Sequence, residues 1–243
     1  METLFWFLFG MSMGVLGGIS AYTLIQSEIN NIQKNKRRKN MNNYLCIEGN
    51  KIELTSEQIT ELKKSLNVGR TKLSDVKIGE TFKIGKYEFI VLDHSKETTA
   101  VILKDLLHER KEFGKNNNYA NSYVDGICNN FADEIKDLVG ARNLIEHTVD
   151  LTADDGLKDY GKTKRFASLL TANLYRRYVE ILDKYKLNKW WWLATAYSTP
   201  KHGDTSWVKC VSPSGFVNGN GYYDSGVRPF CILNSNIFVS SEE

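Results

Sequence analysis

Three apolar runs near the C-terminus decide the fold: Trp-Trp-Trp-Leu-Ala-Thr-Ala at 190–196, Trp-Val-Lys-Cys-Val at 207–211, and Gly-Val-Arg-Pro-Phe-Cys-Ile-Leu at 226–233. Loops rich in Gly, Ser, Asn and Tyr separate these runs, a pattern typical of short strands joined by turns. Four of the five Trp residues and all three Pro residues of the chain lie in this stretch. Because side chains alternate between the two faces of a strand, at least one ring of the triplet is expected in the core, and we assign Trp191 and Trp192 a structural role.

Three further strand-like runs lie upstream, at 81–84, 87–92 and 99–103. The dipeptide Gly85-Lys86 is a tight-turn signal between the first two. These runs therefore predict an antiparallel meander.

The middle of the chain has the apolar spacing of helices. Asn121 or Ser122 can cap a helix that continues to Val139 and stops at Gly140. Thr171 can cap a second helix, whose apolar side comprises Leu174, Tyr178, Ile181 and Leu182. Strands at both ends with helices between them indicate an α+β domain.

The N-terminal segment Leu4–Ile25 has 22 residues and no charge, which is long enough to span a bilayer. The acidic start and the lack of a cleavage signal favour an anchor over a signal peptide. Five cations follow, between Lys34 and Lys39, and predict that this side stays in the cytoplasm. We expect a single-pass protein with its N-terminus outside and its main domain in the cytoplasm.

Three glycines, Gly10, Gly14 and Gly18, repeat at four-residue spacing and share one face of the predicted span. Such a face allows close helix approach, so self-association is one interpretation. The alternative is that glycine is simply common in membrane helices.

A short segment between anchor and main domain has its own pattern. Tyr44–Ile47 and Lys51–Leu54 are predicted strands around a Gly49-Asn50 turn, and Thr55 with Gln58 has the spacing of a capping box before a helix. The predicted domains are an anchor and basic linker at 1–43, this small unit at 44–70 and the main domain at 71–243. Met41 is a candidate alternative start that would give a soluble form.

Composition limits the classes of function. A net charge of +3 is too small to indicate a nucleic-acid partner. The four cysteines (Cys46, Cys128, Cys210 and Cys231) form no pair at metal-ligand spacing, so neither a zinc site nor a disulfide scaffold is predicted. The four histidines are scattered, and no catalytic constellation or cofactor is predicted.

An acidic run, 150–159, carries four carboxylates in ten residues. Oxygen-rich loops can bind calcium, but here the glycine comes one place late and Gly161 stands where an EF-hand has its glutamate. A turn in which Asp side chains accept bonds from backbone amides is the alternative that we favour.

Arg228 stands in an apolar run, and a buried arginine must be paired. Asp224 or an upstream carboxylate is the expected partner. We interpret Arg228 as a determinant of the fold, with a ligand contact as the alternative.

The loops of the C-terminal stretch are the best binding candidates. Aromatic, Asn and Gly side chains on loops that a rigid sheet supports are typical of recognition surfaces. Ordinary turns with tyrosines packed over the core are the alternative. The predicted binding residues are Tyr197, His202, Trp207, Phe216, Asn218, Tyr222 and Tyr223.

The hairpin at 79–92, the triplet Trp191-Trp192-Leu193 and the closing Gly226-Val227-Arg228-Pro229 together resemble an uncharacterised domain family of prophages and Gram-positive bacteria. The resemblance covers about residues 73 to 239 and implies a fold like those of C-type lectins and formylglycine-generating enzymes. Family members often have Arg after Trp-Trp-Leu, where this chain has Ala194. The calcium-ligand motifs of C-type lectins are missing, so the resemblance implies no calcium-bridged sugar site.

These observations predict a non-enzymatic, membrane-tethered module of phage or prophage origin that binds a protein or a glycan through its C-terminal loops. One alternative is an enzyme of the formylglycine-generating type that uses Cys210 or Cys231. Another is a phage structural or assembly protein without a small ligand.

Overall fold

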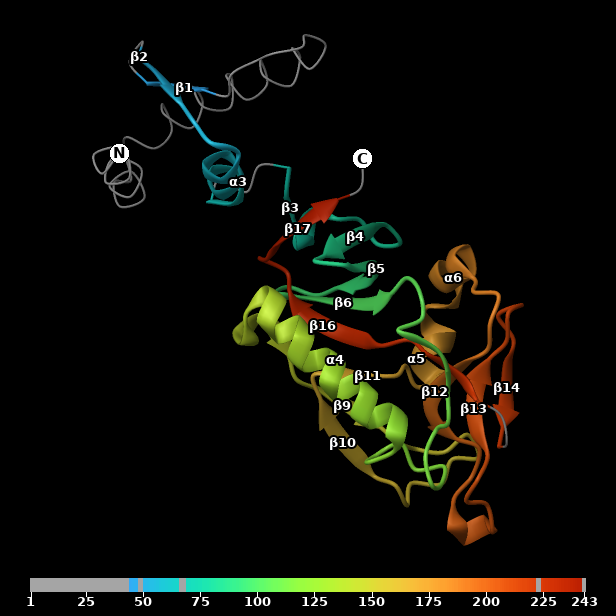
Figure 1. Cartoon of the computed structure of the whole chain (residues 1–243). Coiled ribbons are helices and arrows are strands. Elements are labelled where there is room, and N and C mark those ends of the chain that lie inside the picture. The colour runs from blue at the N-terminus through green and yellow to red at the C-terminus, as the bar shows by residue number, and fades with distance from the viewer. Residues whose placement is uncertain (1–43, 48–49, 66–68, 222–223, 242–243) are drawn as a thin grey trace. The chain divides into compact units, whose positions relative to one another are not determined.

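The computed structural model describes residues 44–47, 50–65, 69–221 and 224–241, and the chain divides into two compact units between Ser65 and Leu66 (Figure 1). The predicted span Leu4–Ile25, its glycine face and the basic segment lie outside the described residues. Within the described ranges, no helix has both the length and the hydrophobicity to cross a bilayer.

The smaller unit contains the predicted hairpin and helix. Strand β1 (Tyr44–Ile47) pairs antiparallel with β2 (Asn50–Glu53), and α3 (Ser56–Ser65) follows. The capping box is confirmed, because Thr55 N donates to Gln58 Oε1 at 2.9 Å and Gln58 N donates to Thr55 Oγ1 at 3.2 Å.

The larger unit is a mixed α+β domain, as predicted, and its described residues form sheets of eight and five strands and a two-stranded ribbon. The eight-stranded sheet holds, in spatial order, β11 (Ala167–Ser168), β16 (Phe230–Asn234), β6 (Thr98–Leu103), β5 (Tyr87–His94), β4 (Thr81–Ile84), β17 (Phe238–Ser241) and β3 (Thr71–Lys72), and β8 (Leu144–Ile145) also pairs with β16. The five-stranded sheet holds β14 (Val217–Asn220), β13 (Val208–Val211), β12 (Trp191–Ala196), β15 (Ser225–Val227) and β7 (His108–Lys111). The ribbon is made of β9 (His147–Asp150) and β10 (Lys162–Arg165).

The predicted meander is confirmed: β4 pairs antiparallel with β5, and β5 with β6. Gly85 has a φ of +56° at the turn between β4 and β5, a conformation that explains the glycine there.

The helices begin where the sequence predicts. In α4 (Tyr123–Val139), Ser122 Oγ accepts a bond from Asp125 N at 3.1 Å, and Gly140 follows the last turn. Thr171 caps α5 (Ala172–Arg177) in the same way. The single helix expected after Thr171 is instead divided at Tyr178, whose backbone leaves the helical region (φ −107°, ψ 13°), into α5, α6 (Val179–Leu182) and a 3-10 turn, η3 (Asp183–Tyr185).

Three clusters of apolar side chains form the core. Phe131 and Ile135 of α4 pack with Phe82 and Phe89 on one face of the eight-stranded sheet. The opposite face joins α5, α6 and the five-stranded sheet in a second cluster that includes Trp191. A third cluster, under the other face of the five-stranded sheet, includes Trp192. The predicted alternation of the two rings is therefore confirmed.

The run 226–233 is not one strand. β15 joins the five-stranded sheet beside β12 and β7, whereas β16 joins the eight-stranded sheet beside β6. Arg228-Pro229 stands between the two strands, so this dipeptide is where the chain passes from one sheet to the other. The C-terminal stretch therefore pairs with the meander through β16 and β6.

Arg228 is buried, but the expected pairing with Asp224 or an upstream carboxylate is wrong, because the hydrogen bonds of its side chain in the described residues go to backbone carbonyls. Its Nε donates to the carbonyl of Leu103 at 2.8 Å, and its Nη2 donates to that of Lys104 at 2.7 Å. The guanidinium also lies 5.3 Å from the centre of a Trp191 ring. Burial lowers the pKa of Arg228 to about 10, and the charge of Asp105 opposes that shift. Backbone carbonyls, rather than a carboxylate, satisfy this side chain.

Candidate functional site

Two predicted binding residues, Tyr197 and Trp207, lie together at one end of the five-stranded sheet. Tyr197 follows β12 and Trp207 precedes β13, and Tyr197 N donates to Trp207 O at 2.8 Å. The exposed fractions are 52% for Tyr197 and 41% for Trp207, although most apolar residues of the adjoining strands are buried. Large exposed aromatic side chains held by a sheet are a sign of a binding surface.

Both rings lie against the backbone of β14 and the residue after it. A Cβ added to Gly219 would lie 3.4 Å from Trp207 Cε3 and 3.6 Å from Tyr197 Cδ2. One added to Gly221 would lie 3.3 Å from Trp207 Cδ2. The two glycines thus let the rings approach the strand closely. We call Tyr197, Trp207, Gly219 and Gly221 the aromatic platform.

Charged side chains border the platform. Lys209 Nζ lies 5.2 Å from the centre of the Tyr197 ring and 3.1 Å from a carboxylate oxygen of Asp154. Arg176 Nη2 bonds the other oxygen of Asp154 at 2.9 Å. Burial raises the pKa of Asp154, but the bonds from Arg176 and Lys209 outweigh it and hold the pKa below its usual value. Lys209 and Arg176 thus share the carboxylate of Asp154, and a second carboxylate, that of Asp204, accepts a bond from Trp207 N at 3.2 Å.

Aspartates of the acidic run form hydrogen bonds with the loop between Tyr197 and Trp207. Asp155 Oδ2 accepts bonds from Ser198 Oγ at 2.5 Å and from His202 Nδ1 at 2.9 Å. Asp159 accepts one from Thr199 Oγ1 at 2.9 Å. The loop also contains a 3-10 turn, η4 (Pro200–His202). His202, predicted as a binding residue, is thus one of the side chains that hold the loop.

The acidic run itself forms turns in which Asp side chains accept bonds from backbone amides, which is the interpretation that the sequence favours. Thr152 N donates to Asp150 Oδ1, and Leu157 N donates to Asp155 Oδ1. Over the described part of the chain, no three His, Cys, Asp or Glu side chains are grouped so that they could hold a metal ion.

Buried Asn117 also holds this loop in place, although its sequence pattern does not indicate such a role. Its Nδ2 donates to the carbonyls of Ser198 and Trp207, at 3.1 and 3.3 Å, and its Oδ1 accepts from Tyr160 at 2.5 Å. The only local signal is a run of three asparagines at 116–118, which is typical of a solvent-exposed loop.

The other predicted binding residues do not join the platform. Phe216 is 64% exposed, but it precedes β14, at the opposite end of the β13–β14 hairpin from Trp207. The Asn218 side chain accepts a bond from Gly219 N at 2.8 Å. Tyr222 and Tyr223 lie outside the described residues.

A shallow groove of about 420 Å³ lies elsewhere, where β5 begins and β6 ends. Charged side chains, leucines and one tyrosine line it. Its lining is Lys83, Lys86, Tyr87, Glu88, Leu103, Asp105, Leu106 and Leu107. None of the predicted binding residues lines this groove.

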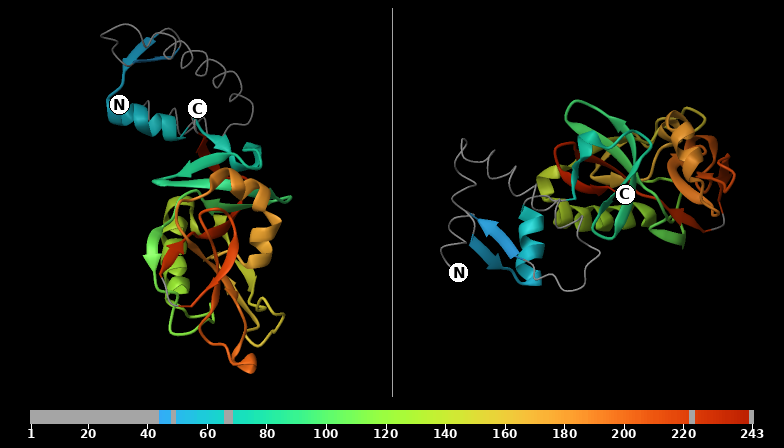
Figure 2. Two further views of the ribbon diagram at one scale, coloured as in Figure 1. Left: turned by 90° about the vertical axis from the view of Figure 1, so that its right-hand side faces the viewer. Right: turned by 90° about the horizontal axis from the view of Figure 1, so that it is seen from above.

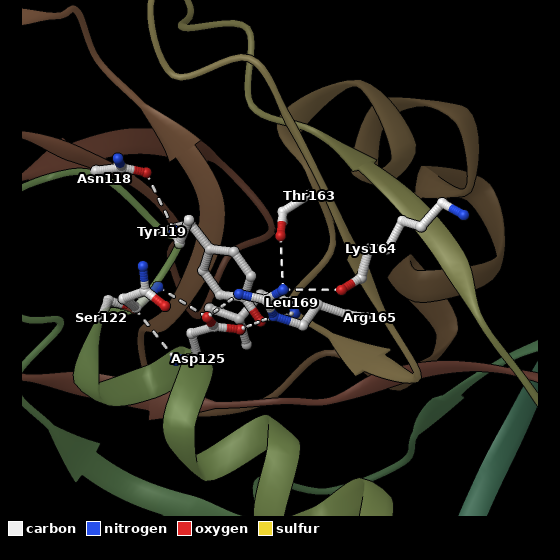
Figure 3. Close-up of polar contacts among 10 residues, drawn as sticks. Asn118, Tyr119, Ser122, Asp125, Thr163, Lys164, Arg165 and Leu169 are labelled. Carbon is white, nitrogen blue, oxygen red and sulfur yellow. Dashed lines mark hydrogen bonds and ion pairs between the residues drawn. The ribbon is translucent and has the colours of Figure 1, made fainter.

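A buried ion pair ties α4 to β10 (Figure 3). Arg165 Nε and Nη2 bond the two oxygens of Asp125 at 2.7 and 2.6 Å, and Asp125 is 1% exposed. Beside it, buried Tyr119 OH accepts a bond from Leu169 N at 3.2 Å. Every group in this cluster is matched by a partner in the fold, so the arrangement supports a structural role.

The candidate thiols of the enzyme alternative are buried. Burial raises the pKa of Cys210 to about 11 and raises that of Cys231 still further. A thiol with a raised pKa is a weak nucleophile, so neither residue favours that alternative.

No family model matches this chain, and comparisons with curated proteins and with solved structures also yield no match.

Proposed function

We propose that this protein is a non-enzymatic, membrane-tethered binding module with a C-type-lectin-like core, and that it recognises a protein or a glycan through its C-terminal loops. One observation carries the proposal: Tyr197 and Trp207 are half exposed on a loop that Asp155 and Asn117 hold in place. Ordering such rings in advance lowers the entropic cost of binding.

The path of the chain through the larger unit supports a tether. The unit begins at β3, which pairs with the last strand, β17. The loop containing η4 lies at the far end of the same unit in both Figure 1 and the left view of Figure 2. Within the larger unit, the loop between Tyr197 and Trp207 is thus distant from β3, the strand that the predicted anchor precedes in the sequence.

The membrane topology is part of the proposal. The span Leu4–Ile25 and the cations that follow it predict that the larger unit faces the cytoplasm, where its partner would then be. A reporter fused after Glu243 should be active only in the cytoplasm. Activity only outside the cell would refute this orientation, and a product starting at Met41, seen by N-terminal mass spectrometry, would reveal the soluble form.

The binding site is tested by crosslinking the full-length chain to its partner in the producing cells. We expect the double variant Tyr197→Ala/Trp207→Ala to lose the crosslinked product, because both ring surfaces are removed. Phe216→Ala is a matched control, since it deletes an exposed ring of the same sheet outside the platform. Equal crosslinking of the double variant and the wild type, with both folded, would reject this site.

A further inference from the structure

We propose that Asn218 is a site of spontaneous covalent modification, at which the side-chain amide is lost as ammonia and the residue becomes isoaspartate or aspartate. It belongs to one of two consecutive Asn-Gly dipeptides, 218–219 and 220–221. Such dipeptides react readily because glycine has no Cβ to hinder its own backbone nitrogen. The reaction is independent of the proposed function, since it needs neither a ligand nor a partner.

The backbone nitrogen of Gly219 lies beside the carbon atom that it would attack. Gly219 N donates a hydrogen bond to Asn218 Oδ1 at 2.8 Å. Since a C=O bond is about 1.2 Å long, Gly219 N lies within about 4 Å of Asn218 Cγ. Reacting atoms about 3–3.5 Å apart are in the geometry of attack, so a rotation of the Asn218 side chain is enough to bring the two together.

The pairing of β14 leaves this nitrogen on the outer edge of its sheet. Ser212 N donates to Phe216 O at 2.9 Å, so these two residues form a hydrogen-bonded pair where the β13–β14 hairpin turns. Because hydrogen-bonded pairs alternate along an antiparallel ladder, Asn218 belongs to the next such pair and Gly219 does not. Gly219 N therefore points away from β13, and β14 is the outermost of the five described strands of this sheet. Asn218 is exposed, so water can reach the reacting groups.

The two Asp-Gly dipeptides of the chain, 125–126 and 155–156, lack this arrangement. Gly126 N lies inside α4 and donates to a backbone carbonyl at 3.1 Å. Gly156 N donates to Ala153 O at 2.9 Å. Both carboxylates accept bonds from distant side chains, and a carboxylate is a weaker electrophile than an amide. Geometry and chemistry thus single out Asn218 among these dipeptides.

The atoms of the reaction balance with water as the co-reactant. Gly219 N loses its proton to solvent and forms a bond to Asn218 Cγ. The bond from Cγ to Nδ2 breaks, and Nδ2 leaves as ammonia. Water then opens the cyclic imide that has formed. Opening at the main-chain carbonyl of residue 218 gives isoaspartate, and opening at Cγ gives aspartate.

The product changes the strand that supports the aromatic platform. Isoaspartate inserts an extra carbon atom into the main chain just before Gly219. That insertion shifts Gly219 relative to Lys209, its partner in β13. Tyr197 and Trp207 lie against Gly219, so the modification displaces the backbone under both rings.

The test follows residues 218 and 220 by peptide mass spectrometry while the full-length protein is incubated in detergent at neutral pH. A second sample is incubated in guanidinium chloride. Endoproteinase Asp-N, which cuts before aspartate but not before isoaspartate, distinguishes the two products. We expect Asn218 to react at least as fast in the folded protein as in the denatured one. Slower conversion of Asn218 in the folded protein, or conversion at residue 220 alone, would overturn the proposal.

Glycine-to-alanine variants identify the attacking nitrogen. A Cβ at Gly219 would meet its neighbours at 3.4 Å or more, so Gly219→Ala should fold. We expect this variant to slow the conversion of Asn218 about tenfold, because the Cβ crowds the nitrogen. Gly221→Ala is the matched control and should leave the rate at Asn218 unchanged. Equal rates in Gly219→Ala and the wild type would show that Gly219 N does not attack.

Discussion

Buried charged residues in this protein find partners that are distant in sequence. Asp125 bonds Arg165, 40 positions later, and Arg228 bonds carbonyls at 103 and 104. Charge and burial pattern predict that such residues are paired, but the choice of partner depends on which strands become neighbours. For that reason the sequence predicts correctly that Arg228 is buried and paired, but the carboxylate partner predicted for it is wrong.

Breaking the Asp125–Arg165 pair should be costly. Arg165→Met leaves a carboxylate that is 1% exposed without its guanidinium, and we expect a loss of about 3–5 kcal/mol in the free energy of unfolding. The double variant Asp125→Leu/Arg165→Met should lose less than the sum of the single losses, because neither charge remains buried alone. Denaturant titrations followed by tryptophan fluorescence measure all three. Strictly additive losses would contradict the pairing.

His147 should make stability depend on pH. Its Nε2 lies 2.9 Å from Ser168 Oγ, its ring meets Phe230 edge-on, and Glu146 is the neighbouring charge. In the described part of the chain its buried Nδ1 has no hydrogen-bond partner. Burial lowers the pKa of His147 to about 4, so the folded protein keeps the ring neutral at pH values where the unfolded chain binds a proton.

The sign of the effect follows from that difference. In the unfolded chain, the pKa of a histidine is about 6.5. Above this pH the ring is neutral in both states, and stability is retained. Between pH 6.5 and pH 4 the free energy of unfolding falls by about 1.4 kcal/mol per pH unit. The free energy of unfolding should therefore be about 2 kcal/mol lower at pH 5 than at pH 7. His147→Gln should show a clearly smaller difference between these two pH values, and an identical difference would disprove the assignment.

Among the secondary-structure elements, local signals indicate where helices begin more clearly than which sheet a strand joins. The ends of α4 follow from Ser122 and Gly140, because capping uses side chains within three or four residues. The division of 226–233 between two sheets has no such signal, since both halves are apolar and strand-prone. The composition of the loops predicts Tyr197 and Trp207 as binding residues. It predicts Phe216 with them, because sequence order does not show which end of a hairpin a residue occupies.

Arg228 holds the junction between β15 and β16 against the end of β6, and a lysine cannot replace it. One ammonium group cannot reproduce the Nε and Nη2 bonds to two successive carbonyls, so Arg228→Lys should cost about 2–3 kcal/mol in the free energy of unfolding. Arg177→Lys, at a side chain that is 64% exposed and paired with Asp93, should cost less than about 0.5 kcal/mol. Thermal unfolding of both variants gives the comparison, and similar costs would count against this role for Arg228.

For the larger unit as a whole, the α+β class and the meander were predicted from the sequence, but the two-sheet arrangement was not. The link between the sheets comes from Tyr175 of α5, Leu182 of α6 and Tyr178 between these two helices, which share one cluster with residues of both sheets. Helices and strands are visible as periodicities, whereas the sheet that a buried strand joins depends on contacts made only after collapse.

Closure of the larger unit by its last strand predicts the effect of truncation. β17 pairs with both β3 and β4, its Val239 is 2% exposed, and Ser235 just before it bonds Thr99. Ending the chain after Asn234 should cost on the order of 5 kcal/mol, a large part of the net stability of a typical domain. We expect an insoluble or protease-sensitive product, whereas removing only residues 242–243 should leave limited proteolysis unchanged. A folded truncated chain would show that β17 is dispensable.

The pairing of β3 with β17 also determines how the larger unit would respond to tension. The two strands run antiparallel, with Thr71 opposite Val239, so the chain enters and leaves side by side. A pull on the two ends would peel the ladder apart one hydrogen bond at a time, because each bond in turn carries the load. Force applied between the base of this unit and a ligand on the η4 loop would instead run through the body of the sheets, so the same protein would be soft along one direction and stiff along the other.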